Sequence, residues 1–373
     1  MSLILHVLPY DLARGAQRYA RSLVDSLDGD ADSHQILTLF RADPVLLRPD
    51  VELDVPQGLP RRVGLDPRVV LRLRDQVRRI GPAVVVAHGG ESAKYVALAT
   101  PKEVPIVYLK IGTAHESLRQ RGRKGLHGYY SRRASVVAAV SSDVAEEANR
   151  LYGVPEDRLM VMPNARDPHV FRPRLDGAAR EVPRLIFVGH LDPGKRPDWF
   201  LDVVAELRRR DLAFEAVMVG DGPLEQSLRG RAEAAGVEML GRRDDVADLL
   251  ADSDIFVFTS LPPGEGMPGV LIEAALSGLA TVSTRVPGAK DVIEDGVSGT
   301  IVDTDDREAM VDAVDRLIGD PELRRAMGAR ARERGLEGYT LEASAEQWRS
   351  LFRRLAPDFL GRSQTGPAGT GAP

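Results

Sequence analysis

The sequence predicts an α/β protein built from two successive parallel sheets, each with crossover helices. Three observations predict this fold class: short continuous apolar runs recur along the chain, helical segments separate them, and the alternation stops and restarts near the middle. A continuous apolar run is typical of a strand that is covered on both faces, as in parallel sheets. With 373 residues, the chain is long enough for two domains of ordinary size.

The first half of the chain, residues 1–165, is predicted to be one Rossmann-like domain. Its expected strands are 3–8, 35–40, 83–87, 105–109, 136–140 and 159–161, and helices are expected at 15–27 and 142–151. Strands that alternate with helices pair in parallel, because each helix carries the chain back across one face of the sheet.

The second half repeats this alternation after a break. Prolines 168, 173 and 183 interrupt the periodicity, so residues 166–183 are predicted to be a linker. A second Rossmann-like domain is expected over 184–340, followed by a helix at 341–356. Its expected strands are 185–189, 214–220, 254–259, 280–284 and 300–302, and its helices are 198–209, 224–235, 269–276, 307–318 and 321–333. The tail, 361–373, is rich in Gly, Pro, Ser and Thr and is predicted to be disordered.

Composition excludes several function classes. The net charge of −5 argues against bulk binding of nucleic acid, and the absence of cysteine excludes thiolate metal sites and a cysteine nucleophile. No apolar stretch is long enough to span a membrane, and the apolar start is short and lacks a basic region, so it is predicted to be a strand rather than a signal peptide. We therefore expect a cytoplasmic protein, with peripheral contact at the inner membrane face left open.

The most informative motif is the segment 264–273, Gly-Glu-Gly-Met-Pro-Gly-Val-Leu-Ile-Glu. Glu265 and Glu273 lie eight residues apart and flank a glycine-rich turn at the expected start of a helix. Backbone N–H groups and the positive end of a helix dipole suit a diphosphate, and carboxylates accept hydrogen bonds from hydroxyls. The alternative is a helix N-terminus that is enriched in Glu for dipole reasons alone.

Weaker signals follow other predicted strands. Lys195, one of only six lysines, follows Gly189 in a turn and could face a phosphate, although a basic surface turn is an equally simple interpretation. Gly222 allows close approach of the backbone at the next strand end. Gly15 stands between the first strand and first helix, but the segment is not the G-x-G-x-x-G fingerprint of dinucleotide-binding proteins.

The order and spacing of these motifs resemble the retaining GT-B glycosyltransferases of the family-four, or "group 1", type. The resemblance runs from residue 3 to about residue 355 and includes Glu-x7-Glu, Gly-x5-Lys, Gly-Asp-Gly-Pro at 220–223 and the run 286–299. It implies a GT-B architecture in which the two sheets face a central cleft. It also implies that the second domain binds a nucleotide-sugar, the first domain binds the acceptor, and the last helix crosses back to the first domain.

The resemblance also implies roles for individual residues. Glu265 would contact the donor sugar, Glu273 the ribose hydroxyls, and Lys195 the diphosphate leaving group. The backbone near Arg242 would meet the base, with Val246 and Leu249 beneath it, and Gly15 would close over the phosphate. The complete donor set is Gly15, Gly189, His190, Lys195, Arg196, Gly222, Arg242, Val246, Leu249, Glu265, Gly266, Met267, Pro268, Gly269 and Glu273.

Two positions depart from the family pattern. His190 stands where the family places an arginine, and Arg196 is a candidate replacement. Ile111 stands where many relatives have a histidine near the reacting centre. His88 and Lys110 are the candidate catalytic replacements, and each also has a purely structural interpretation.

The expected function is retaining transfer of a hexose from a nucleoside-diphosphate sugar to a hydroxyl acceptor, without a metal or a bound cofactor. UDP is favoured as the nucleotide and GDP comes second. The alternatives are a GT-B-type UDP-sugar epimerase and a degenerate, non-catalytic protein that binds nucleotide or glycan. The basic segment 118–133, with Arg119 and Arg121, is a candidate acceptor or lipid contact, although a solvated helix face explains it equally well. The oligomeric state stays open.

Overall fold

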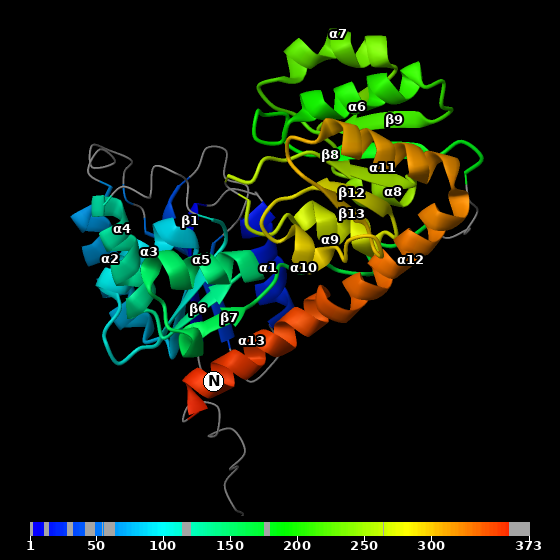
Figure 1. Cartoon of the computed structure of the whole chain (residues 1–373). Helices are drawn as coiled ribbons and strands as arrows, with labels where there is room; N and C mark the ends of the chain where they lie inside the picture. Colours follow the sequence, from blue (N-terminus) through cyan, green and yellow to red (C-terminus); the bar gives the residue numbers. More distant parts are fainter. Residues whose placement is uncertain are drawn as a thin grey trace, which may run out of the picture. The chain divides into compact units, whose positions relative to one another are not determined.

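The computed structural model describes residues 3–10, 15–27, 33–41, 49–53, 55, 64–113, 121–174, 180–263 and 265–357. The chain divides into two compact units, which Figure 1 shows in the colours of the sequence. Unit 1 comprises Met1–Gly112, Glu116–Met162 and Leu341–Pro373, and unit 2 comprises Thr113–His115 and Pro163–Thr340. The predicted tail, 361–373, lies outside the described residues.

Unit 1 is an α/β domain with one parallel sheet. Its described strands pair in the order β3-β2-β1-β4-β5-β6-β7. The strands are β1 (Leu3–Tyr10), β2 (Ser33–Phe40), β3 (Val51–Glu52), β4 (Val84–His88), β5 (Ile106–Lys110), β6 (Val136–Ala139) and β7 (Leu159–Val161). The helices are α1 (Gly15–Leu27), α2 (Pro67–Ile80), α3 (Gly89–Ala99), α4 (Arg121–Arg133), α5 (Ser142–Tyr152) and the short η3 (Glu156–Arg158).

Local sequence chemistry sets the ends of these elements. In α2, the Asp66 side chain caps the first turn by accepting from Arg68 N, Pro67 opens the helix, and Gly81 ends it in the left-handed conformation. The strand β4 is buried along its whole length, as the apolar run 83–87 predicts. The parallel sheet expected for the first half of the chain is therefore confirmed.

The C-terminal helix α13 (Leu341–Leu355) belongs to unit 1 and packs on α1. The hydroxyl groups of Tyr19 on α1 and Ser344 on α13 form a hydrogen bond with an oxygen–oxygen distance of 2.9 Å. The indole N–H of Trp348 donates to the Tyr19 hydroxyl at 3.3 Å. The Trp348 side chain is fully buried.

Unit 2 repeats the architecture with a second parallel sheet, whose described strands pair in the order β10-β9-β8-β11-β12-β13. The strands are β8 (Arg184–Val188), β9 (Glu215–Val219), β10 (Glu238–Gly241), β11 (Ile255–Phe258), β12 (Ala280–Thr284) and β13 (Thr300–Val302). The helices are α6 (Pro197–Arg209), α7 (Glu225–Ala235), α8 (Val246–Ala251), α9 (Gly269–Leu276), α10 (Ala289–Val292), α11 (Arg307–Gly319) and α12 (Pro321–Gly338). The predicted second sheet is confirmed.

The long helix α12 packs closely against α9. A Cβ on Gly328 would lie 2.1 Å from the carbonyl oxygen of Gly278, and one on Gly335 would lie 3.1 Å from the Leu276 side chain. The Arg332 guanidinium also donates to the Leu276 carbonyl at the end of α9. Glycines at the contact let α12 approach closely, so α9 rests on a rigid neighbour.

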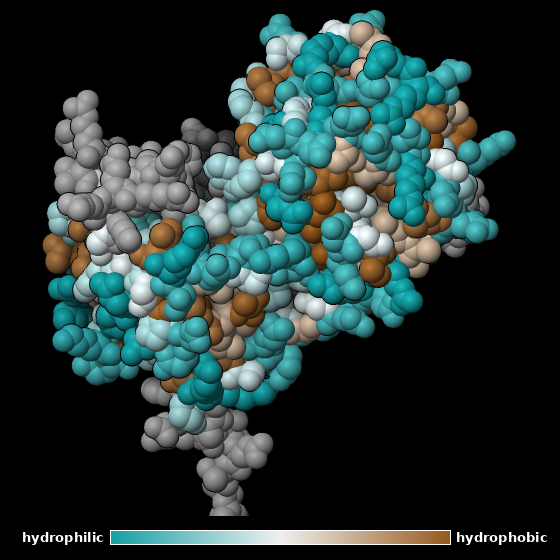
Figure 2. All heavy atoms as spheres, in the orientation of Figure 1, coloured by the Kyte–Doolittle hydropathy of each residue, from teal (hydrophilic) through white to brown (hydrophobic). Residues whose placement is uncertain are grey.

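On the face that Figure 2 shows, hydrophilic residues cover most of the described surface, and hydrophobic residues are interspersed among them. Among the described helices, none combines the length and the apolar character that crossing a membrane requires.

Candidate functional site

The predicted motifs of unit 2 gather at the carboxyl edge of its sheet. Gly189 follows β8, Gly222 follows β9, Arg242 follows β10, and the segment 265–269 follows β11. The strands run in parallel, so their carboxyl ends meet at one edge, which is where open α/β sheets bind ligands.

Two glycines pack the first loops of this edge together. A Cβ on Gly220 (φ 139°) would lie 1.8 Å from the Gly189 carbonyl oxygen, and one on Gly222 would lie 2.6 Å from the Leu191 carbonyl oxygen. The Leu191 N–H donates to the Asp221 carbonyl at 2.8 Å. The close approach that the sequence predicts at Gly222 is thus an approach to protein backbone.

The loops after β8 and β11 bring Lys195 and Glu265 into an ion pair between Nζ and Oε1. The Lys195 ammonium also lies 5.5 Å from the centre of the Phe258 ring, and its backbone N–H donates to the Asp192 carboxylate at 2.9 Å. Lys195 is 29% exposed and Glu265 is 14% exposed, so both groups remain reachable from solvent. Two residues predicted from separate motifs therefore meet.

The glycine-rich segment between the two glutamates is held from two sides. The Asn164 amide donates to the Met267 carbonyl at 2.9 Å. A Cβ on Gly288 (φ 79°) would lie 2.5 Å from the Gly266 carbonyl oxygen, so residues 266 and 267 rest directly on that glycine. Pro268 stands at the N-cap of α9 without a capping side chain, which leaves backbone N–H groups of the first turn without a side-chain partner.

Glu273 has an ion-pair partner that the sequence did not predict. The Nε of Arg166 donates to Glu273 Oε1 at 2.7 Å, and both side chains are mostly buried, with 17% and 16% exposure. Arg166 lies at the start of the predicted linker, 166–183, and Asn164 lies at the end of the predicted first domain, 1–165. No local pattern assigns either residue a partner.

His190 and Arg196, two other predicted residues of unit 2, lie at the same edge and differ in the interactions that they make. His190 Nδ1 lies 3.7 Å from the Asp221 carboxylate, and both side chains are more than half exposed. The Arg196 guanidinium donates to the Thr304 carbonyl at 2.6 Å and stacks on Trp199 with its Cζ 3.2 Å from the ring centre. Desolvation is the main cause that lowers the pKa of Arg196.

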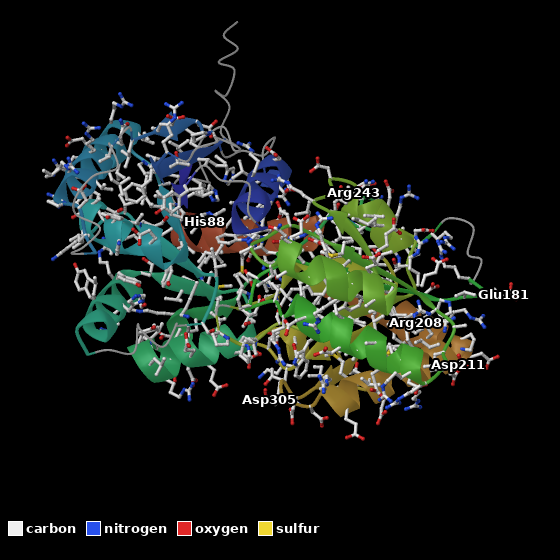
Figure 3. All side chains as sticks on the ribbon, turned by 90° about the horizontal axis from the view of Figure 1, so that it is seen from above. His88, Glu181, Arg208, Asp211, Arg243 and Asp305 are labelled. Atoms are coloured by element: carbon white, nitrogen blue, oxygen red, sulfur yellow. The ribbon has the colours of Figure 1, made fainter. Side chains whose placement is uncertain are left out.

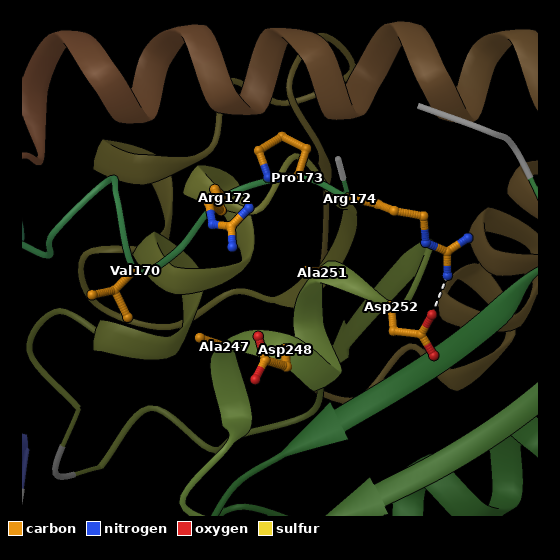
Figure 4. A pocket seen from close by; sticks show the side chains of 8 residues that line it. All are labelled: Val170, Arg172, Pro173, Arg174, Ala247, Asp248, Ala251 and Asp252. Atoms are coloured by element: carbon orange, nitrogen blue, oxygen red, sulfur yellow. Dashed lines mark hydrogen bonds and ion pairs between the residues drawn. The ribbon is translucent and has the colours of Figure 1, made fainter. Parts of the chain in front are cut away.

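The residues predicted to contact the base lie on α8 and just before it. Arg242 is exposed, and Val246 and Leu249 are half-buried on α8. Beside α8 lies a separate cavity of about 310 Å³, which Figure 4 shows with Arg174 bonded to Asp252 at its rim. None of the predicted donor residues lines that cavity; its lining residues are Val170, Arg172, Pro173, Arg174, Ala247, Asp248, Ala251 and Asp252.

In unit 1, His88 ends β4 and belongs to a chain of three buried imidazoles. His6 Nδ1 lies 3.0 Å from His88 Nε2, and His6 Nε2 lies 3.1 Å from His34 Nδ1. Figure 3 labels His88 within unit 1. His88 is 2% exposed, and its Nδ1 has no hydrogen-bond partner among the described residues. His88 thus lies buried at the end of β4 in the sheet of unit 1.

Burial controls the pKa values of this histidine chain. It lowers the pKa of His88 to about 4. The pKa of His6 also falls well below its ordinary value, first through burial and then through the neighbouring His88, His34 and Arg21. The charged forms are therefore disfavoured in the folded protein.

We expect acid to destabilise the fold through these histidines. The pKa of His88 in the folded protein is lower than the ordinary 6.5. The contribution of neutral His88 to the free energy of unfolding is therefore fully present above pH 6.5 and is lost as the pH falls toward 4. Between pH 7.5 and 5 the loss from His88 should be about 2 kcal/mol, at roughly 1.4 kcal/mol per pH unit. Calorimetry should show a smaller pH dependence of Tm in His88→Leu than in the wild type. The exposed His169→Gln should behave as the wild type, and an unchanged slope in His88→Leu would contradict the assignment.

Lys110 ends β5 and forms a buried ion pair with Glu147 of α5. The two groups lie 2.7 Å apart, with side-chain exposures of 5% and 7%. The ammonium also donates to the Gly112 carbonyl at 2.6 Å and lies 5.8 Å from the centre of the Tyr152 ring. Desolvation lowers the pKa of Lys110, and Glu147 opposes that shift. The structure thus shows Lys110 bound to Glu147 and to the turn after β5, and its catalytic role stays a prediction.

The remaining candidates lie at the limits of the described chain. Gly15 begins α1, and its surroundings are not described. Arg119 lies outside the described residues; Arg121 begins α4, but its side chain is not described. Within the described residues, no group of three or more His, Cys, Asp and Glu is arranged to hold a metal ion.

Two family models match the chain, one on each half. Residues 13–170 match "Glycosyltransferase Family 4", and residues 182–320 match "Glycosyl transferases group 1". The chain belongs to this glycosyltransferase family. Curated relatives agree: the chain is 30% identical over 250 residues to the GDP-mannose-dependent alpha-(1-6)-phosphatidylinositol monomannoside mannosyltransferase of Mycolicibacterium smegmatis, covering 62% of this chain and 63% of that protein. It is 24% identical to the alpha-D-kanosaminyltransferase of Streptomyces kanamyceticus, covering 90% and 98%.

The first curated relatives are matched over part of their length. The aligned segments span 21%, 63% and 61% of the first three. Among solved structures, HepE of Anabaena in complex with UDP superimposes with a TM-score of 0.79 at 17% identity, covering 95% of this chain and all of that one. Sucrose-phosphate synthase of Thermosynechococcus elongatus gives the same TM-score at 19% identity, covering 95% and 99%. The family member therefore has the GT-B fold that the sequence predicts.

Proposed function

We propose that this family member transfers a hexose from a nucleoside-diphosphate sugar to a hydroxyl acceptor with retention of configuration. The observation that carries the proposal is the arrangement around the start of α9. Lys195 and Glu265 meet on one side of the glycine-rich segment, and Glu273 lies on the helix itself. A cation, backbone N–H groups without a capping side chain and two carboxylates are the kinds of group that bind a sugar diphosphate.

In the proposed mechanism the protein supplies no nucleophile. The acceptor oxygen bonds to the anomeric carbon on the face from which the diphosphate departs, the bond to the phosphate oxygen breaks, and that oxygen takes the acceptor proton. Lys195 and the N-terminus of α9 stabilise the charge that develops on the leaving group. Glu265 holds hydroxyls of the transferred sugar, which positions the reacting carbon.

We favour UDP as the nucleotide, with GDP second. The solved neighbour HepE carries UDP, and one curated relative is named as GDP-mannose-dependent. Lys195, Glu265 and Glu273 are proposed to bind the diphosphate and the sugars, so these three residues do not distinguish between the two bases. Unit 1 is then the acceptor side of the protein.

Retention can be tested without knowing the acceptor, because water replaces it slowly. We expect NMR of UDP-glucose hydrolysis by the protein to show α-glucose first, with the β-anomer appearing only by mutarotation. A β-anomer formed first would contradict retention. An epimerised nucleotide-sugar from the donor alone would favour the epimerase alternative.

The two glutamates should affect different kinetic constants. Glu265→Gln should mainly lower kcat, because its partner is the sugar at the reacting centre. Glu273→Gln should mainly weaken nucleotide binding, by about 10-fold or more for a lost charge-assisted hydrogen bond. Steady-state kinetics and calorimetry separate the two effects. Unchanged turnover in Glu265→Gln would show that its assigned partner is wrong.

We also propose that the reaction needs no metal ion, since Lys195 and the start of α9 supply the positive charge. Dialysis against EDTA should leave the rate of donor turnover unchanged. A complete loss that manganese or magnesium restores would contradict this part of the proposal.

A further inference from the structure

Arg166 is fixed by its neighbours on three sides. Its backbone N–H donates to the Tyr339 carbonyl at 2.9 Å, and Nη1 donates to the Ala165 carbonyl at 2.9 Å. Nε donates to Glu273 Oε1 at 2.7 Å. An arginine whose backbone N–H and two guanidinium nitrogens all donate hydrogen bonds has little freedom to rotate its side chain.

The face of α9 is shaped to accept this guanidinium. A Cβ on Gly269 would lie 2.1 Å from Arg166 Nη2 and 3.0 Å from Cζ, so any side chain at this position would displace the arginine. Glu273 lies four residues later, on the same face of the helix. Arg166 therefore lies along one helical turn, from the bare Gly269 to the carboxylate of Glu273.

In this arrangement the two carboxylate oxygens of Glu273 have different surroundings. Oε1 is bound to Arg166, and Oε2 has no hydrogen-bond partner among the described residues. An exposed carboxylate on a free side chain would sample several rotamers and lose entropy on binding, whereas this one is already oriented.

We propose that Arg166 is a positioning residue that orients Glu273 toward the ribose hydroxyls of the donor nucleotide. Through that orientation, Arg166 sets the preference of the site for ribonucleotides over 2′-deoxyribonucleotides. This inference rests on the proposed function, since it needs the nucleotide at the start of α9. It adds to that function a residue from outside the motifs, at a position that the sequence assigns to a linker.

The experiment measures Kd by calorimetry for UDP and 2′-deoxy-UDP, and for GDP and 2′-deoxy-GDP. In the wild type we expect the deoxy analogue of the bound nucleotide to bind roughly 10- to 100-fold more weakly, as for a lost hydrogen bond to a charged group. In Arg166→Met this ratio should fall to about threefold or less, because Glu273 is no longer oriented. Arg166→Lys should retain part of it, since it keeps the charge without the planar geometry.

A second variant, at Gly269, changes the contact between α9 and the Arg166 guanidinium. Gly269→Ala should displace Arg166 and reduce the ribose preference, even if Arg166→Met fails to fold. Once Arg166→Met has removed the guanidinium, adding Gly269→Ala should have little further effect on the ratio.

The outcomes separate the two proposals. An unchanged ribose preference in folded Arg166→Met or Gly269→Ala, with tight binding of the ribonucleotide, would overturn the role of Arg166 alone. Binding of no nucleotide by the wild type would overturn the donor site and the role of Arg166 together.

Discussion

Lys195→Met should reduce the rate of sugar transfer by roughly 10²- to 10³-fold, the usual cost of removing one group that stabilises developing charge. The ammonium pairs with Glu265 in the described structure and stands in the loop after β8. When the donor bond breaks, negative charge grows on the leaving phosphate, and Lys195 is paired with Glu265, the carboxylate that we propose binds the donor sugar. Methionine keeps an unbranched apolar side chain and removes the charge, together with the contact between the ammonium and the Phe258 ring.

Two control variants sharpen this test. Lys195→Arg keeps the charge and should recover much of the rate. Lys195→Met with Glu265→Gln removes both charges and shows whether an unpaired Glu265 contributes to the loss. Turnover by Lys195→Met within about threefold of the wild type, at saturating donor, would exclude Lys195 from leaving-group stabilisation.

Lys110→Met should destabilise unit 1 by about 3–5 kcal/mol, the usual cost of removing one member of a buried ion pair. Glu147 is 7% exposed in the folded protein, so water cannot replace the lost ammonium. The turn after β5 should also loosen, because Lys110 donates to the Gly112 carbonyl. Urea unfolding measures the change in free energy.

Lys110→Met with Glu147→Leu distinguishes a structural from a catalytic Lys110. Removing both charges together should restore most of the stability, since replacing a whole buried pair by apolar groups is often neutral. Restored turnover in the double variant would assign Lys110 to structure, and a stable but inactive double variant would assign it to chemistry. Wild-type stability in the single variant would contradict the buried pair itself.

The sequence predicts the two sheets because parallel strands leave a local signal. The apolar runs at β4 and β11 are covered on both faces, and both strands are buried throughout. The turns after β8, β9 and β11 contain Gly or Pro, so these loops of the carboxyl edge of unit 2 could also be located. The start of α9 is visible for the same reason, since the glycine-rich turn and the two glutamates lie within ten residues of one another.

Pairs between distant residues leave no such signal. Glu273 binds Arg166 over 107 residues, Lys110 binds Glu147 over 37, and His6 contacts His88 over 82. Each residue alone is an ordinary charged or polar side chain at a loop, a strand or a helix. His88 and Lys110 could be chosen as unusual strand-end residues, but their burial depends on which helices cover the sheet, and the local pattern does not specify that.

The family resemblance implies that the last helix packs on the first domain, but the local pattern does not specify the contacts that it makes there. The pattern of α13 shows an apolar face, but only the structure shows that Trp348 and Ser344 meet Tyr19 on α1. The division of the chain has the same origin. Residues 163–165 group with unit 2, in which Asn164 donates to the Met267 carbonyl, whereas the sequence pattern predicts the boundary after residue 165.

The most direct test of a nucleotide-sugar site in unit 2 is a thermal-shift measurement with UDP, GDP, dTDP, ADP and NAD. We predict that one nucleoside diphosphate, UDP before GDP, stabilises the wild type by roughly 2.7 kcal/mol at about 100 times its Kd. Glu273→Gln should require a higher concentration of the same nucleotide for the same shift. A wild type that shows no shift with any nucleoside diphosphate at millimolar concentration would contradict the proposed donor site.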